Sequence, residues 1–176
     1  MKTLAVVIAL ALALVLQTRL APFLVLGTSP LDLVLIVVVY VAITSGPTTG
    51  LLAGAAAGLA QDALSSGILG IGGLAKTVVG YLVGLASTQF IVAGPLPRFL
   101  TFLASTVIHA TIFMGLYELL NLRDFGFPWG GVLGQGVANA LVGIVVLQAI
   151  ELLPGAAERH QQRGSGTGMR TSRRLD

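Results

Sequence analysis

Long apolar stretches separated by short polar breaks make up nearly the whole chain. There are six of them, at residues 4–19, 31–45, 47–64, 71–93, 99–120 and 130–153. The longer ones reach the ~20 residues that an α-helix needs to cross the hydrocarbon core of a bilayer. The second and third are shorter and are joined by a tight turn at Thr44–Pro47. The pattern predicts an all-α fold: a polytopic membrane helix bundle of about six transmembrane helices.

Composition supports the membrane interpretation and leaves little room for other classes. Of the 176 residues, 55% are hydrophobic and 10% are charged, whereas a soluble domain carries about 25% charged residues. The chain has no cysteine, which excludes disulfides and thiolate metal sites. We expect no cofactor and no metal site. The expected organisation is a transmembrane bundle at 1–154 and a disordered basic cytoplasmic tail at 155–176.

Positively charged residues predict the orientation of the bundle. With six spans both termini lie on one side, which carries Lys2, Arg98 and the arginines of the tail, whereas Arg19 and Arg123 lie on the other. Both termini are therefore predicted to be cytoplasmic. The basic tail either lies near anionic lipid or is a solvated terminus that fixes topology; nucleic acid is not an expected partner. Cleavage of the first stretch as a signal peptide would leave five spans, but Gln17–Arg19 is a poor cleavage site.

Two glycine ladders occupy the middle of the chain. In each ladder the residues recur on a four-residue step, which keeps them on one face of a helix. Side-chain-free faces allow membrane helices to approach closely. They either pack the two helices together or receive a partner helix. The first ladder is Gly46, Gly50, Gly54, Gly58 and Asp62, and the second is Gly72, Lys76, Gly80 and Gly84.

Ionisable residues inside membrane spans are rare and need partners. Asp62 ends the third predicted helix and Lys76 lies near the start of the fourth, on the same side of the membrane. We expect these two to form an ion pair; alternatively, Lys76 reaches water alone and Asp62 caps a helix end. Asp32 opens the second helix, where an acid favours the helix dipole; a contact with a partner is the alternative. Together Asp32, Asp62 and Lys76 form a predicted outer polar cluster.

The last two predicted spans carry polar residues at matching depths. His109 and Asn139 lie near the middle of the fifth and sixth spans, which run antiparallel. An interhelical hydrogen bond between them is expected, with a proton or ligand role as the alternative. Glu118 and Gln135 match in the same way in the outer third. Arg98 and Glu151 match at the inner end.

The loop between these spans is aromatic. Large rings at a membrane interface usually form an interfacial belt, and aromatic residues with arginine are also favoured at protein interfaces. The loop is therefore either a membrane anchor or a partner-binding surface. Its candidate residues are Arg123, Phe125, Phe127 and Trp129.

The sequence lacks the motifs of membrane enzymes. Leu64 stands where the first glycine of a Gly-x-Ser-Gly serine protease motif would be, and Lys76 would neutralise Asp62 as one member of a carboxylate pair. No metal-ligand cluster and no phosphate-binding loop appears. We therefore expect a protein that is not an enzyme.

A distinctive order of features runs along the first half of the chain. Gln17 closes the first stretch, and it is followed by Pro30, Asp32, the first glycine ladder, Gln61–Asp62, Gly67, Leu69–Gly70, Leu74, Lys76, Gly80–Tyr81 and Gly84. This order, whose core is about residues 30–84, resembles the rod shape-determining MreD family. It implies a non-enzymatic scaffold of the cell-elongation machinery for peptidoglycan, in the bacterial inner membrane. The implied partners are the bitopic protein MreC and, through it, MreB, RodA and a class B penicillin-binding protein.

The resemblance also implies a fold similar to the six-helix S-components of ECF vitamin transporters. A cavity open to the outer face, framed by the segments around Asp32, Asp62 and Lys76, is then expected. This leads to the alternative function, a transporter subunit that binds a small molecule in an outer-facing pocket.

Overall fold

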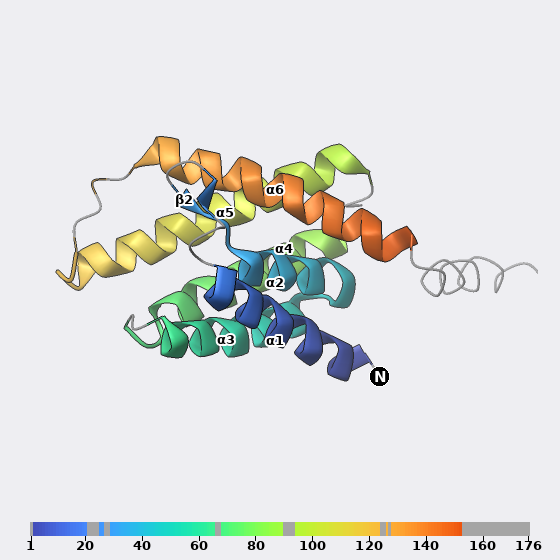
Figure 1. Ribbon diagram of the computed structural model, residues 1–176, viewed down its shortest axis with the longest axis horizontal. Helices are drawn as coiled ribbons and strands as arrows, with labels where there is room; N and C mark the ends of the chain where they lie inside the picture. Colours follow the sequence, from blue (N-terminus) through green and yellow to red (C-terminus); the bar gives the residue numbers. More distant parts are fainter. Residues whose placement is uncertain are drawn as a thin grey trace, which may run out of the picture. The chain divides into compact units, whose positions relative to one another are not determined.

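The computed structural model describes residues 2–20, 25–26, 29–65, 68–89, 94–123, 126 and 128–152. The described chain is helical apart from a two-residue antiparallel pairing of β1 (Val25–Leu26) with β2 (Ser29–Pro30). The predicted all-α fold is confirmed (Figure 1). Its helices are α1 (Lys2–Leu20), α2 (Leu33–Ser45), α3 (Pro47–Leu64), α4 (Ile71–Gln89), α5 (Pro95–Leu119) and α6 (Trp129–Leu152).

Within the described residues, three helices are long and apolar enough to cross a membrane. These are α4, α5 and the part of α6 from Trp129 to Ile150. Leu4–Arg19 of α1 and the whole of α2 are apolar but shorter. That all six helices are spans stays a prediction. Residues Met1–Ile144 form one compact unit, which contains every contact discussed below, and a second unit, Val145–Asp176, begins within α6. The expected boundary at 154/155 lies outside the described residues.

Helices α2 and α3 meet at one turn, where α2 ends and α3 begins, and they differ in length. Gly46 joins them with φ +87°, a conformation that favours glycine, and Pro47 is the first residue of α3, where its missing N–H costs nothing. From this turn α3 runs for 18 residues and α2 for 13. At 1.5 Å per residue, the first turn of α2 therefore lies about 7.5 Å short of the level reached by the Asp62 end of α3. This difference in length determines how far Asp32, just before α2, lies from the level at which α3 ends.

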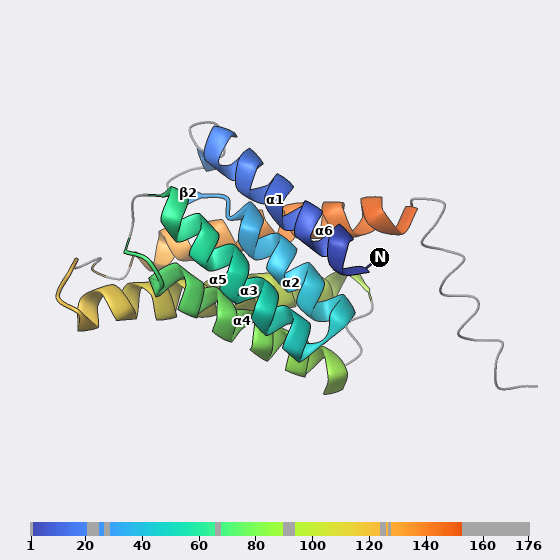
Figure 2. The same ribbon diagram turned by 90° about the horizontal axis from the view of Figure 1, so that it is seen from below.

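The two glycine ladders pack against each other along α3 and α4. A Cβ atom added to Gly50 would overlap the backbone of Gly80, and one added to Gly54 would overlap the backbone of Lys76. At one end Gly58 lies against Gly73, and at the other end Gly84 lies against Pro47. The two helices run side by side in Figure 2. Because each ladder faces the other, its backbone contacts are used within the chain.

An apolar cluster joins α1 and α2 to α3. Apart from Leu10, its buried members are small or β-branched, which allows the three helices to approach closely. Partly buried residues of the same helices, among them Val6 and Tyr40, pack around it. The four helices α1 to α4 thus form a body with its own core. The buried members of the cluster are Leu10, Ala13, Val34, Val38, Val41, Ala53 and Ala57.

Helices α5 and α6 pack on each other up to Ile144. A Cβ atom on Gly143 would come within 2.7 Å of the Phe102 ring, and one on Gly136 would come within 2.7 Å of Leu103 Cδ1. Nearer the loop, a small apolar cluster of Ala110, Met114 and Val132 joins the same two helices. We call this pair the α5–α6 hairpin.

We call the contact between the two glycine ladders the glycine seam. It predicts that two Gly→Ala substitutions differ in their effect on stability. Gly54→Ala should lower the free energy of unfolding by at least about 2 kcal/mol, because the new methyl group overlaps a backbone that cannot move away. Gly134→Ala is the matched control, since nothing lies within 4 Å of its Cβ position. The control should be neutral or stabilised by up to about 1 kcal/mol through helix propensity. Chemical unfolding in detergent micelles measures both, and equal stabilities would contradict the close approach.

Candidate functional site

A buried ion pair lies at the start of α2. Lys76 Nζ in α4 is 2.8 Å from Asp32 Oδ2, and the two residues are 2% and 5% exposed. Lys76 is five residues into α4, about 7.5 Å from its first residue. That is the same distance by which α2 falls short of α3. The short helix therefore brings a carboxylate to the depth at which the ammonium group lies.

The predicted ion pair between Asp62 and Lys76 is wrong. Asp62 Oδ2 instead accepts hydrogen bonds from the backbone N–H groups of Gly70 at 2.9 Å and Gly73 at 3.0 Å. It therefore caps the start of α4 from the end of α3, where the helix dipole favours a negative charge. The Asp62 carboxylate occupies the space beside Gly72, where a Cβ atom would overlap its Oδ1. The alternative considered for Asp62, a capping role, is the one that the geometry supports.

Asp32 also caps its own helix. Its Oδ1 accepts the N–H of Leu35 at 2.9 Å, while Oδ2 holds Lys76. A second orphan N–H of this helix end, that of Val34, donates to Gln17 Oε1 of α1 at 3.0 Å. The role of Gln17 was not predicted from the sequence, although an amide at the end of an apolar stretch indicates a polar group nearby. The start of α2 is thus satisfied by side chains from two helices.

His109 and Asn139 join this cluster, but they do so separately. The predicted hydrogen bond between them is wrong: His109 Nε2 lies 3.1 Å from Lys76 Nζ, and Asn139 Oδ1 accepts the N–H of Asp32 at 3.1 Å. Asn139 Nδ2 donates to Thr106 Oγ1 at 3.1 Å. Because α2 begins beside them, His109 and Asn139 bind the paired lysine and the N–H of Asp32 instead of each other.

The contact with the Lys76 ammonium assigns a tautomer to the imidazole ring. A lysine ammonium can only donate, so Nε2 of His109 accepts and the ring proton is on Nδ1. A charged imidazole would place two cations beside the single carboxylate of Asp32. Lys76 and Asp32 therefore form the charged pair, and His109 is a neutral member of the cluster.

The cluster lies deep in the bundle. His109 is ten residues from the end of α5, and Asn139 is ten residues from the start of α6. Both positions are about 15 Å from those helix ends, which is half of a ~30 Å hydrocarbon core. Charged and polar groups at such a depth are costly unless they are paired. Here each of them has a partner from another helix.

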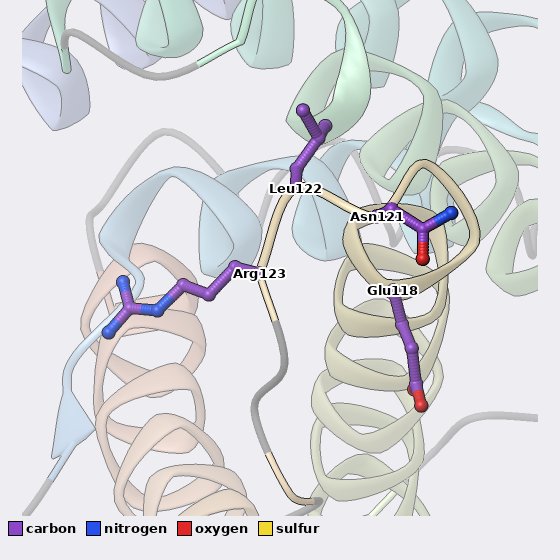
Figure 3. Close-up of a pocket in the computed structure, with 4 residues that line it drawn as sticks. All are labelled: Glu118, Asn121, Leu122 and Arg123. Atoms are coloured by element: carbon purple, nitrogen blue, oxygen red, sulfur yellow. The ribbon is translucent and has the colours of Figure 1, made fainter.

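An open pocket of about 320 Å³ lies at the end of α5, lined by Glu118, Asn121, Leu122 and Arg123. In Figure 3 the side chain of Arg123 extends to one side of the loop, whereas that of Glu118 points along α5. Trp129 is half exposed at the start of α6, whereas Phe125 and Phe127 lie outside the described residues. The pocket is formed by other residues than the cluster of Asp32 and Lys76. The predicted pairs of Glu118 with Gln135 and of Arg98 with Glu151 stay predictions.

Comparison with protein families decides the identity. The family model of the rod shape-determining protein MreD matches residues 1–147. The chain belongs to the MreD family. A comparison with curated proteins and one with solved structures give no match. The expected likeness to ECF S-components thus stays a prediction.

Membership in the MreD family places the chain in the membrane and gives it a role in rod shape determination. MreD proteins are structural components of the cell-shape machinery rather than a known enzyme family. Within the described residues, no group of three His, Asp or Glu side chains could hold a metal ion. Asp32, Asp62 and Lys76, which the resemblance to MreD singled out, all bind to other parts of the same chain.

A double-mutant cycle should separate the two candidate ion pairs. Lys76→Met leaves the Asp32 carboxylate buried and unpaired, so stability should fall by about 3–5 kcal/mol. Adding Asp32→Asn should recover a large part of this loss, because the amide still accepts from Leu35 and carries no charge. The matched cycle with Asp62→Asn should be nearly additive. Unfolding in detergent measures both cycles, and coupling with Asp62 in place of Asp32 would overturn the assignment.

Proposed function

We propose that this MreD protein is a non-enzymatic scaffold of the bacterial inner membrane that binds an MreC-like bitopic protein. Through this partner it connects the cytoplasmic MreB filaments with RodA and its class B penicillin-binding protein. The proposal rests on the family, whose role is rod shape determination. A scaffold needs an exterior that other membrane helices can contact, and the exposed large hydrophobic residues on the helices support this role.

The observation that carries the proposal is the internal use of the polar groups. The Asp32–Lys76 pair, His109, Asn139 and the Asp62 cap are bound to other helices of the same chain. The large hydrophobic residues exposed on the helices are mainly leucine and valine, such as Leu12, Leu82 and Leu141. A binding pocket for a small molecule usually has convergent polar groups that are left for the ligand. The arrangement therefore favours contact with helices over binding of a vitamin-sized ligand.

The partner assignment can be tested by co-purification. An affinity-tagged MreD chain co-expressed with an MreC-like protein should retain it in mild detergent, whereas an unrelated single-span protein should be lost. Tryptophan substitution at Leu12, Leu82 and Leu141 probes three exposed helix faces. We expect recovery to fall about tenfold for at least one face while the variant alone unfolds like the wild type, because a bulky ring prevents helix contact.

Two results would contradict the scaffold proposal. The first is the absence of any retained MreC-like protein when both chains are present in the membrane. The second is tight retention of a vitamin-sized ligand that is lost in Asp62→Ala while partner binding is kept. Asp62→Asn is the matched control for Asp62→Ala, since its amide oxygen still accepts hydrogen bonds from the backbone N–H groups of Gly70 and Gly73.

We further propose that all six helices are spans and that both termini are cytoplasmic. A reporter fused after Arg174 should then be active on the cytoplasmic side, and a cysteine at the α5–α6 loop position Leu122 should react with an impermeant maleimide from outside. Leu122 is exposed, and the chain has no other cysteine. A cytoplasmic location of Leu122 or a periplasmic reporter would overturn the topology.

A further inference from the structure

We propose that the exposed face of α4 binds a second copy of this chain, so that the Tyr81 hydroxyls of the two copies are hydrogen-bonded to each other. The proposal concerns the chain alone and does not rest on the MreC-like partner proposed above. It is based on the depth of Tyr81 and on the chemistry of its surroundings. We call the residues that follow one another along this face the α4 stripe: Leu74, Val78, Tyr81, Leu85 and Thr88.

Helix α4 buries one face and leaves the opposite face open. The helix packs on α2, α3 and α5, and its buried residues include Lys76, Val79 and Val83. The members of the α4 stripe recur in steps of three or four residues, which places them on a single face. Four of them are exposed and Val78 is partly exposed. This face is therefore available along most of the length of the helix.

Tyr81 lies near the middle of α4, a helix long and apolar enough to cross a membrane. It is ten residues from the first residue of the helix and eight from the last, which corresponds to about 15 Å and 12 Å. In a hydrocarbon core ~30 Å thick, this position is close to the centre. Tyrosines that face lipid usually lie at the membrane interface instead, where the hydroxyl reaches water. The depth of Tyr81 is therefore unusual for a residue that faces only lipid.

The Tyr81 hydroxyl also lacks a partner in the part of the chain that the structure describes. The side chain is 43% exposed, whereas Tyr40 and Tyr117 both interact within the chain. On the same helix, the hydroxyls of Thr77 and Thr88 donate to carbonyl groups of α4 itself. A hydroxyl without a hydrogen bond in an apolar medium costs free energy. A partner from another molecule would remove this cost.

A second copy of the chain supplies such a partner at the correct depth. Two copies inserted in the same direction are related by a two-fold axis along the membrane normal, which brings equivalent residues to the same level. A phenol both donates and accepts, so one Tyr81 hydroxyl can donate to the other. The α4 stripe carries no charged residue, so the symmetric contact does not bring like charges together. The face is thus complementary to itself.

The absence of native cysteine allows this contact to be tested with single cysteines. Leu85→Cys places a thiol on the α4 stripe, one turn from Tyr81. Leu141→Cys is the matched control, since Leu141 is also exposed and lies at a similar distance from the start of its helix, α6. The purified chain, with no other protein, is reconstituted in dilute phosphatidylethanolamine–phosphatidylglycerol vesicles. An oxidant is added, and the rate at which disulfide-linked dimers form is measured.

Leu85→Cys should form dimers at least tenfold faster than Leu141→Cys. Adding Tyr81→Phe should slow this reaction about threefold or more, because it removes one hydrogen bond between membrane helices and keeps the ring. Thr88→Val is the control on the same face, since the Thr88 hydroxyl bonds to the carbonyl of Leu85 on its own helix. It should leave the rate unchanged. Tyr81→Phe should also unfold like the wild type, because the hydroxyl has no partner among the described residues.

Two results would overturn the proposal. Equal rates for Leu85→Cys and Leu141→Cys would mean that the α4 stripe is covered by lipid or by another protein. A rate at Leu85→Cys that Tyr81→Phe leaves unchanged would exclude the phenol from the contact. Because no MreC-like protein is present in the vesicles, neither result bears on the scaffold proposal.

Discussion

The buried ammonium group of Lys76 requires a carboxylate at its own depth, and the arrangement of the bundle follows from how that carboxylate is supplied. A lysine inside hydrocarbon is tolerated only when it is paired. Helix α2 provides Asp32 because it stops five residues short of α3, from which a single glycine turn separates it. An α2 as long as α3 would carry a helical backbone past Lys76. The acid at its start would then lie near the bundle surface, where the ion pair would stabilise little.

The glycine seam between α3 and α4 also restricts where the Lys76 side chain can lie. Gly54 faces the backbone of Lys76, so α3 and α4 are in contact at the residue that carries the charge. This close approach leaves the lysine side chain no space on the α3 side and directs it toward α2 and α5. One turn away, the bare Gly72 admits the Asp62 carboxylate, which caps the start of α4. The ladders thus separate the two acids: one is used for the lysine and the other for the helix end.

The sequence predicted the helices well, because their boundaries depend on local features. Pro47 and Gly46 mark the turn between α2 and α3, and the apolar stretches match the helices. The four-residue step indicated which faces of α3 and α4 are bare. It did not decide between internal packing and a partner, since a glycine stripe looks the same in both cases. Only the position of Gly80 opposite Gly50 shows that the seam is filled by the chain itself.

The polar partners were predicted less well, for a physical reason. Pairing Asp62 with Lys76 followed their proximity in sequence, whereas the real partner of Lys76 is 44 positions earlier in the chain, at Asp32. The lengths of α2 and α3 predict where Asp32 lies relative to the end of α3, but only if the end of α2 and the start of α3 are known to be at one level. His109 and Asn139 lie near the middle of α5 and α6, as the sequence predicted. Their partners were missed because both bind groups at the start of α2, and only the three-dimensional arrangement reveals a helix start inside a bundle.

The location of the polar groups bears on how such a protein can act in the cell-shape machinery. A bundle whose charges are satisfied internally presents lipid and neighbouring proteins with apolar helix faces, and such faces discriminate poorly among partners. Selectivity must then come from shape, which depends on the rigid placement of the helices. In this chain His109 of α5 and Asn139 of α6 bind Lys76 and Asp32 in the interior, away from the exposed helix faces. An internal polar cluster can therefore control the exterior surface without itself being exposed to a partner.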